Sequence, residues 1–238
     1  MSVYRTEYRL GTRDVNRDDR LRTSVMFELL QNAAEQQNEI LDLGQAAMQK
    51  AGRFWAVVRQ RAEIARMPGF GEVITLETWP GQPRHALFPR YYRILTASGQ
   101  TLVSVSSLWA VVRLDSRTME FPEEAEFHTA SLITGNETAL PRPIQCVREG
   151  SPDRFTVPFS CIDRNGHMNN ARYFDLAEDG ASAAAEGKEL LEVAAEYNFE
   201  ARLGERICLY RSESGGQCTV SGRSGGKRLF SVSLQYRE

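Results

Sequence analysis

The sequence predicts an α+β fold made of two similar halves, each with a long helix wrapped by an antiparallel sheet. In each half, one helix-like segment comes before a series of strand-like segments separated by short turns with glycine or proline. Residues 61–72 and 195–205 can also be laid over one another, which pairs Glu63 with Glu196. A helix buries its apolar face on a curved sheet, so each half can form its own core. Two unrelated α+β domains joined by a linker would also give this pattern.

In the first half, residues 23–43 predict the helix. Apolar side chains recur there at mostly helical spacing, Thr23 or Ser24 is placed to cap the start, and Gly44 is expected to end the helix. The predicted strands cover residues 54–65, 73–79, 86–96 and 101–114, with turns at Pro68-Gly69, Pro80-Gly81 and Ser98-Gly99 between them.

The second half repeats this order. It has a short predicted strand at 155–161, a helix at 170–185, and strands at 193–200, 206–213, 217–222 and 228–237. Residues 122–151 are rich in proline, glutamate and threonine and have the composition of a linker. The predicted domains are therefore an N-terminal half at 1–121, a linker at 122–151 and a C-terminal half at 152–238.

The composition of the chain argues against several classes of function. The chain has 238 residues, of which 42% are hydrophobic, enough to build a full core, and a formal net charge of −2, which argues against broad nucleic-acid binding. Its four cysteines show no C-x-x-C or Cys/His ligand spacing, so we expect reduced thiols and no structural zinc. The sequence shows no signal-peptide pattern and no apolar run long enough to span a membrane. We expect a protein of a reducing cytoplasm without a membrane span.

The most informative segment is residues 163–170, called the motif loop below, because it spaces three hydrogen-bonding side chains two residues apart. In extended backbone Asp163, Asn165 and His167 would project to the same side and could meet one substrate. Gly166 relaxes the chain between them. A plain turn before a capped helix has the same composition, so that alternative stays open.

A helix is predicted directly after these side chains. Asn169 or Asn170 can cap residues 171–185, where alanine and leucine favour helix. The motif loop would then lie at a helix N-terminus, where backbone N–H groups can polarise a bound carbonyl group.

The motif loop resembles the D-x-N-x-H-x-N-N signature of acyl-acyl-carrier-protein (acyl-ACP) thioesterases, the bacterial relatives of the plant fatty-acyl thioesterases. Residues 4–9 (YRTEYR), the helical run at 23–43, Phe54-Trp55 and Thr78-Trp79 also resemble the first half of that family, so the resemblance covers nearly the whole chain. It implies a tandem, or double, hotdog fold whose halves form one continuous sheet. It also implies that the first half houses the acyl chain and the second carries the catalytic motif.

Hydrolysis of a thioester requires a positioned water, a group that takes its proton, and donors aimed at the developing oxyanion. The motif loop offers these kinds of group. His167 can exchange protons near pH 7, Asp163 can orient it or act as a base, and Asn165 can hold the water or the substrate through its amide. His85 and His128 are expected to be exposed and outside the site.

The resemblance adds an acidic residue, which Glu200 matches, with Glu196 as the reserve. An extended strand would put both carboxylates on one face, and both could also be plain surface carboxylates. The plant relatives have a cysteine where this chain has Ala201, so we expect carboxylate-assisted attack by water rather than a covalent cysteine. Cys161 is a reserve nucleophile whose main expected role is packing.

The predicted function is hydrolysis of acyl-ACP thioesters to a free fatty acid and the carrier thiol. No metal or diffusible cofactor is expected, because the substrate carries its own phosphopantetheine. The expected partner is the acyl carrier protein, acidic in this family, which arginines of the N-terminal segment or Arg202, Arg206 and Arg211 could steer. An acyl-CoA thioesterase and a non-catalytic acyl-thioester binding protein are the alternatives. Chain length, saturation, carrier, and a monomeric or homodimeric state stay open.

Overall fold

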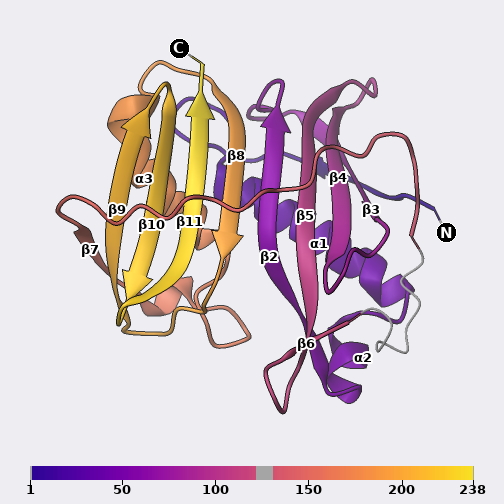
Figure 1. Ribbon diagram of the computed structural model, residues 1–238. Coiled ribbons are helices and arrows are strands. Elements are labelled where there is room, and N and C mark those ends of the chain that lie inside the picture. The colour runs from indigo at the N-terminus through magenta and orange to yellow at the C-terminus, as the bar shows by residue number, and fades with distance from the viewer. Residues whose placement is uncertain (1, 122–130, 238) are drawn as a thin grey trace. The chain divides into compact units, whose positions relative to one another are not determined.

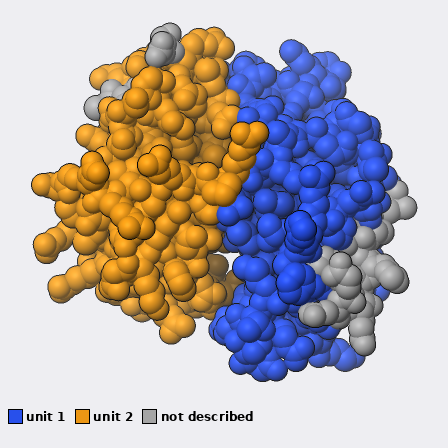
Figure 2. All heavy atoms as spheres, in the orientation of Figure 1, with its two compact units in different colours: residues 1–141 blue, residues 142–238 orange. Residues whose placement is uncertain are grey.

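The computed structural model describes residues 2–121 and 131–237. The chain divides into two compact units, Met1–Pro141 (unit 1) and Arg142–Glu238 (unit 2), coloured blue and orange in Figure 2. Each unit has a helix on one face of an antiparallel sheet, as the sequence predicts (Figure 1). Part of the predicted linker, residues 122–130, lies outside the described residues. The limits at 1–121, 122–151 and 152–238 stay a prediction.

Unit 1 forms an antiparallel sheet in the order β1-β3-β4-β5-β2, with β6 paired to β5. The helix α1 contacts β1 and β3 and buries one apolar face, on which Met26, Phe27 and Leu30 are at most 3% exposed. The elements of this unit are β1 (Tyr4–Arg9), α1 (Thr23–Ile40), α2 (Gln45–Lys50), β2 (Arg53–Ile64), β3 (Val73–Pro80), β4 (Phe88–Thr96), β5 (Thr101–Arg113) and β6 (Met119–Glu120).

The ends of α1 differ from the prediction. Arg22 occupies the cap position and its side chain makes no capping hydrogen bond to the helix, while Thr23 and Ser24 are buried helical residues, so neither caps the helix. The helix ends at Ile40 rather than at Gly44. Asp42 takes the left-handed conformation that ends it, with φ of 55°, and Gly44 instead precedes α2, which the sequence did not predict.

Unit 2 forms an antiparallel sheet in the order β8-β11-β10-β9-β7. The helix α3 contacts β10 and β11. Gly180 allows this approach, because a Cβ there would lie 3.1 Å from the Val220 side chain. The elements of this unit are β7 (Asp153–Thr156), η1 (Phe159–Cys161), α3 (Arg172–Ala185), β8 (Leu190–Tyr197), β9 (Arg206–Ser214), β10 (Gln217–Ser224) and β11 (Lys227–Tyr236).

Two predicted strands of the second half are wrong at their ends. The segment 155–161 divides into β7 and the short 3₁₀ helix η1, since Pro158 between them has no N–H to continue the ladder. The segment 193–200 lies three residues earlier, as β8, so Glu200 follows the strand instead of lying in it. Among the described residues, no helix combines the length and the apolar content needed to cross a membrane.

Candidate active site

The motif loop begins with a tight turn and not with extended backbone. The Asp163 N–H donates to the His167 carbonyl oxygen at 2.9 Å, and the Gly166 N–H donates to the Asp163 carbonyl oxygen at 3.1 Å. An isolated bridge between Ile162 and Met168 closes the turn, and Gly166 has the positive φ of 83° that favours glycine. The prediction that alternation along an extended chain aligns the side chains at 163, 165 and 167 is therefore wrong.

The Asp163 carboxylate stabilises this turn. Its Oδ1 accepts a hydrogen bond of 2.8 Å from the Asn165 N–H, the arrangement of an Asx turn. Asn165 itself is exposed at the tip, while Asp163 is half-buried. A structural role for the Asp163 carboxylate is thus visible in the geometry of the loop.

The turn brings His167 to Glu200. The His167 Nε2 lies 3.1 Å from the Glu200 Oε2, and the two side chains are 23% and 40% exposed. This distance allows a direct hydrogen bond between an imidazole and a carboxylate. The partial exposure also leaves the pair accessible to water. Of the four predicted site residues, these two are in direct contact through their side chains.

Backbone hydrogen bonds attach the motif loop to two neighbouring segments. The Met168 N–H donates to the Ala201 carbonyl oxygen at 2.8 Å, and the Asn169 N–H donates to the Cys161 carbonyl oxygen at 2.9 Å. Met168 is 3% exposed and Ala201 is 0% exposed, so the first of these bonds is shielded from water. The loop after β8 and the 3₁₀ helix η1 therefore hold the motif loop from two directions.

The helix α3 starts at Arg172, one residue later than a cap at Asn170 would place it and two later than a cap at Asn169, because Ala171 occupies the cap position. The Asn169 side-chain oxygen accepts from the Ala171 N–H at 2.8 Å, and its carbonyl oxygen accepts from the Arg172 N–H at 2.9 Å. Asn169 thus shapes the entry into α3 from just outside the helix.

Glu196, the reserve carboxylate, faces a different environment. It is 5% exposed, and its Oε2 accepts from Arg228 Nη2 at 2.6 Å and from the Ile144 N–H at 2.9 Å. The prediction that it shares a strand face with Glu200 is wrong. The main chain bends after β8, where the N–H groups of residues 198 and 199 both point to one carbonyl oxygen, that of Leu229.

The cysteines and His85 lie outside the His167–Glu200 contact. Cys161 is half-buried, and burial raises the pKa of its thiol. Ala201 is fully buried, so this position is one of packing. His85 is exposed on a turn, as predicted, whereas His128 lies outside the described residues. Among the described residues, no group of three or more His, Cys, Asp or Glu side chains is placed to hold a metal ion.

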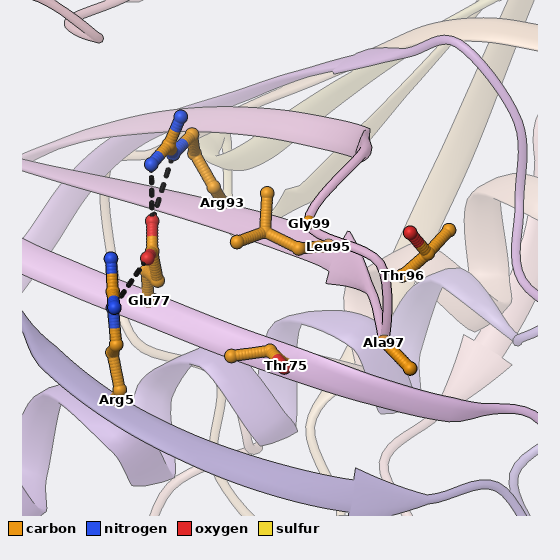
Figure 3. A pocket seen from close by; sticks show the side chains of 8 residues that line it. All are labelled: Arg5, Thr75, Glu77, Arg93, Leu95, Thr96, Ala97 and Gly99. Atoms are coloured by element: carbon orange, nitrogen blue, oxygen red, sulfur yellow. Dashed lines mark hydrogen bonds and ion pairs between the residues drawn. The ribbon is translucent and has the colours of Figure 1, made fainter.

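Unit 1 has a pocket, shown in Figure 3, whose lining residues were not among the predicted site residues. This pocket of about 260 Å³ is lined by side chains of β1, β3 and β4 and by the turn after β4. Its Glu77 carboxylate, 1% exposed, lies 2.6 Å from both Arg5 and Arg93. These residues are direct cross-strand neighbours, which becomes visible only when the strand register is known. None of the predicted site residues lines this pocket.

Solved structures share this architecture over almost the whole chain. An acyl-ACP thioesterase from Bacteroides thetaiotaomicron matches with a TM-score of 0.91 and 19% identity, covering 99% of this chain and 98% of the other. A protein described as an oleoyl thioesterase from Lactobacillus plantarum matches with a TM-score of 0.86 and 26% identity, covering 99% and 96%. The chain is therefore a double hotdog protein of the α+β class.

Family models identify it more closely. The acyl-ACP thioesterase N-terminal domain matches residues 1–125, and the acyl-ACP thioesterase C-terminal domain matches residues 144–238. The chain belongs to the acyl-ACP thioesterase family, which confirms the resemblance found in the motif loop. The chloroplastic palmitoyl-acyl carrier protein thioesterase of Arabidopsis thaliana is 24% identical over 163 residues, which are 64% of this chain and 40% of that protein. The chain spans about half the length, or less, of the curated relatives it matches.

Proposed function

We propose that this protein hydrolyses acyl-ACP thioesters to a free fatty acid and the thiol of the carrier. Family membership supports the reaction class. The observation that carries the proposal is the 3.1 Å contact between His167 Nε2 and Glu200 Oε2, made by the motif loop and the loop after β8. An acid–imidazole pair that is open to water provides the proton acceptor that hydrolysis needs.

In this mechanism the Glu200 carboxylate and the His167 imidazole activate one water molecule. The carboxylate takes a proton from the water while the water oxygen attacks the thioester carbonyl carbon, and the carbonyl oxygen becomes an oxyanion. When the intermediate collapses, the carbon–sulfur bond breaks and the leaving sulfur receives that proton through the His167–Glu200 pair. Asn165, exposed at the tip of the turn, holds the water or the carbonyl oxygen through its amide. Asp163 helps to position Asn165 and His167, because its carboxylate maintains the turn.

The two halves have separate tasks in this proposal. The first, at 1–121, takes up the acyl chain against the apolar side chains around α1. The second, at 152–238, carries the catalytic side chains, and residues 122–151 link the two. The reaction needs no metal and no diffusible cofactor, because the chemistry is proton transfer and water attack, and the substrate brings its own phosphopantetheine.

The proposed partner is an acidic acyl carrier protein in a reducing cytoplasm. Arg202 and Arg206 are exposed in and beside the loop that carries Glu200, so they can attract an acidic surface to the site. Arg211, the third predicted arginine, donates to the Gly180 carbonyl oxygen at 2.6 Å and pairs with Glu213, so it contributes less. Steering of this kind weakens with salt, and the apparent KM for the acyl carrier should rise with ionic strength.

The decisive test is thiol release from ACP thioesters with short to long acyl chains, measured for the wild type, H167A and the matched control H85A. We expect turnover in the wild type and in H85A, and a loss of at least about 100-fold in H167A, because general acid–base catalysis typically contributes 10²–10⁴-fold. The same acyl groups on coenzyme A form the second panel. A higher kcat/KM on coenzyme A would identify an acyl-CoA thioesterase instead. Binding of the acyl thioester without turnover in the wild type would identify a binding protein.

A further inference from the structure

The turn at residues 202–205 lies just after Glu200 and is closed by the side chain of Glu205. The Glu205 Oε2 accepts a hydrogen bond of 3.0 Å from the Arg202 N–H, and the Glu205 N–H donates to the Arg202 carbonyl oxygen, also at 3.0 Å. Gly204 has the left-handed conformation that favours glycine, with φ of 75°. Glu205 therefore binds the first residue of the turn through its side chain and through its main chain.

This turn and the residue before it are attached to two neighbouring segments. The turn exchanges two backbone hydrogen bonds, of 2.9 and 3.0 Å, with Val157. The carbonyl oxygen of Ala201, directly before the turn, accepts the Met168 N–H of the motif loop at 2.8 Å. Val157, Ala201 and Met168 are each at most 3% exposed, so water cannot readily replace these partners. Glu200 thus lies between the bend after β8 and a fixed turn.

Unit 1 contains the same turn, closed by the same kind of side chain. The Glu72 Oε1 accepts from the Gly69 N–H at 2.8 Å, and the Glu72 N–H donates to the Gly69 carbonyl oxygen at 3.2 Å. Gly71 has the matching φ of 78°. The turn exchanges two backbone hydrogen bonds of 2.9 Å with Leu10, as its counterpart does with a residue of unit 2. The two turns are therefore equivalent, in agreement with the overlay of the two halves in the sequence.

The motif loop also has a counterpart in unit 1, at residues 16–21. The Asn16 N–H donates to the Arg20 carbonyl oxygen at 2.8 Å, and the Asn16 Oδ1 accepts from the Asp18 N–H at 3.0 Å. Asn16 therefore closes this loop in the same way as Asp163 closes the motif loop. Each unit thus has a loop of this kind and a turn of the kind described above.

One backbone hydrogen bond joins the loop to the residue before the turn in each unit, and we call the loop, the turn and this bond the frame. In unit 1 the Leu21 N–H donates to the Pro68 carbonyl oxygen at 2.8 Å, as the Met168 N–H does in unit 2. Arg20 and Met67 therefore occupy the positions that the imidazole and the carboxylate occupy in unit 2. The Arg20 Nη1 donates to the Met67 carbonyl oxygen at 3.3 Å, so the two positions meet in unit 1 as well. The frame brings them together whatever side chains they carry, and a guanidinium and a thioether cannot take a proton from water.

We propose that Glu205 is a positioning residue, whose carboxylate holds the turn of the unit 2 frame and thereby keeps the Glu200 carboxylate within hydrogen-bonding distance of His167. The role rests on the proposed function of that pair as the water-activating group. Glu205 does not act on the substrate in this proposal; it acts through the main chain of the turn. Small misplacements of a catalytic group reduce the rate strongly, so one hydrogen bond across the turn can matter for turnover.

The kinetic test compares E205A with E72A, the same substitution in the equivalent turn of unit 1. E72A is a strict structural control, because Glu72 also forms an ion pair of 2.7 Å with Arg66. We expect kcat of E205A on acyl-ACP to fall about 10-fold with KM within about twofold, and E72A to keep the wild-type kcat. E205Q can still accept the Arg202 N–H through its amide oxygen, so it should recover most of the lost rate. E205A/E200Q should be no slower than E200Q alone, because both changes disable one catalytic group.

A second readout does not depend on turnover. The chain has three histidines, so imidazole ¹H–¹³C cross-peaks can be assigned by comparison with H167A. We expect E205A to move the cross-peak of His167 and to leave that of His85 in place, and E72A to leave the His167 cross-peak unmoved. Spectra are recorded at a temperature where both variants are folded.

The outcomes separate positioning from a general loss of structure. An unmoved His167 cross-peak in E205A, a wild-type kcat in E205A, or losses that multiply with E200Q would each overturn the proposal. Equal losses of kcat in E205A and E72A would also overturn it, because the turn of unit 1 carries no catalytic group. A cross-peak that E205A moves, in a protein whose wild type hydrolyses no acyl-ACP, would overturn the proposed function alone.

Discussion

Glu196 and Glu200 lie four residues apart in the chain, yet their carboxylates have opposite surroundings. Glu196 is in β8, almost fully buried, and its Oε2 is bound by Arg228 and by the Ile144 N–H. Glu200 lies beyond the strand, 40% exposed, beside the imidazole of His167. The bend at residues 198 and 199 separates the two environments. Glutamate therefore has a structural role at position 196, before the bend, and can have a chemical role at position 200, after it.

The difference follows from what each environment does to a charge. A buried carboxylate costs free energy unless a cation and hydrogen-bond donors compensate it, so Glu196 needs its contacts with Arg228 and the Ile144 N–H to stay charged in the fold. A partly exposed carboxylate keeps much of its hydration and can exchange a proton with a bound water. Substitutions at the two positions should consequently separate loss of activity from loss of stability.

The largest effect is expected at Glu200. E200Q keeps the size and a hydrogen-bonding oxygen but removes the group that accepts the proton of the water, so kcat should fall about 10²–10⁴-fold. The free energy of unfolding should change by no more than about 0.5 kcal/mol, because the side chain is exposed. Thiol release and urea unfolding on the same preparation measure both quantities. Full activity in E200Q would remove Glu200 from the mechanism.

At Glu196 we expect the reverse, a large loss of stability and a small change in kcat. E196A leaves the partly buried Arg228 without its carboxylate and the Ile144 N–H without an acceptor, so it should destabilise the protein by about 3 kcal/mol. E196Q is the matched control, since its amide oxygen can still accept from Ile144, and it should lose less. Each variant should keep kcat per folded molecule within a few-fold. If E196Q folded as stably as the wild type but lost turnover, Glu196 would be the water-activating carboxylate.

The sequence predicted the architecture well, because helix and strand periodicity recur in the same order in both halves. The start of α1 and the conformation of the motif loop depended instead on burial and on single hydrogen bonds. Thr23 and Ser24 have good capping side chains, yet burial against the sheet places them inside α1. The motif loop looked extended by spacing alone, whereas Gly166 and the Asp163 carboxylate close it into a turn. Such outcomes depend on tertiary packing and on single hydrogen bonds, which residue spacing does not encode.

The contact between the two site residues also could not be predicted from residue spacing. The family resemblance named Glu200 as an acidic site residue, but its contact with His167 was not predicted. The bend after β8 that produces it depends on two N–H groups sharing one carbonyl oxygen.

The smallest effect is expected at Cys161, the reserve nucleophile. Burial raises the pKa of its thiol, so little thiolate is present near neutral pH, and the thiolate is the reactive form. C161A removes one partly buried sulfur and should keep kcat within about twofold. A loss comparable to that of E200Q, together with inactivation of the wild type but not of C161A by iodoacetamide, would indicate a covalent thiol. Water attack assisted by Glu200 predicts instead that alkylation at Cys161 leaves the pH dependence of turnover unchanged, because the proton acceptor is a carboxylate.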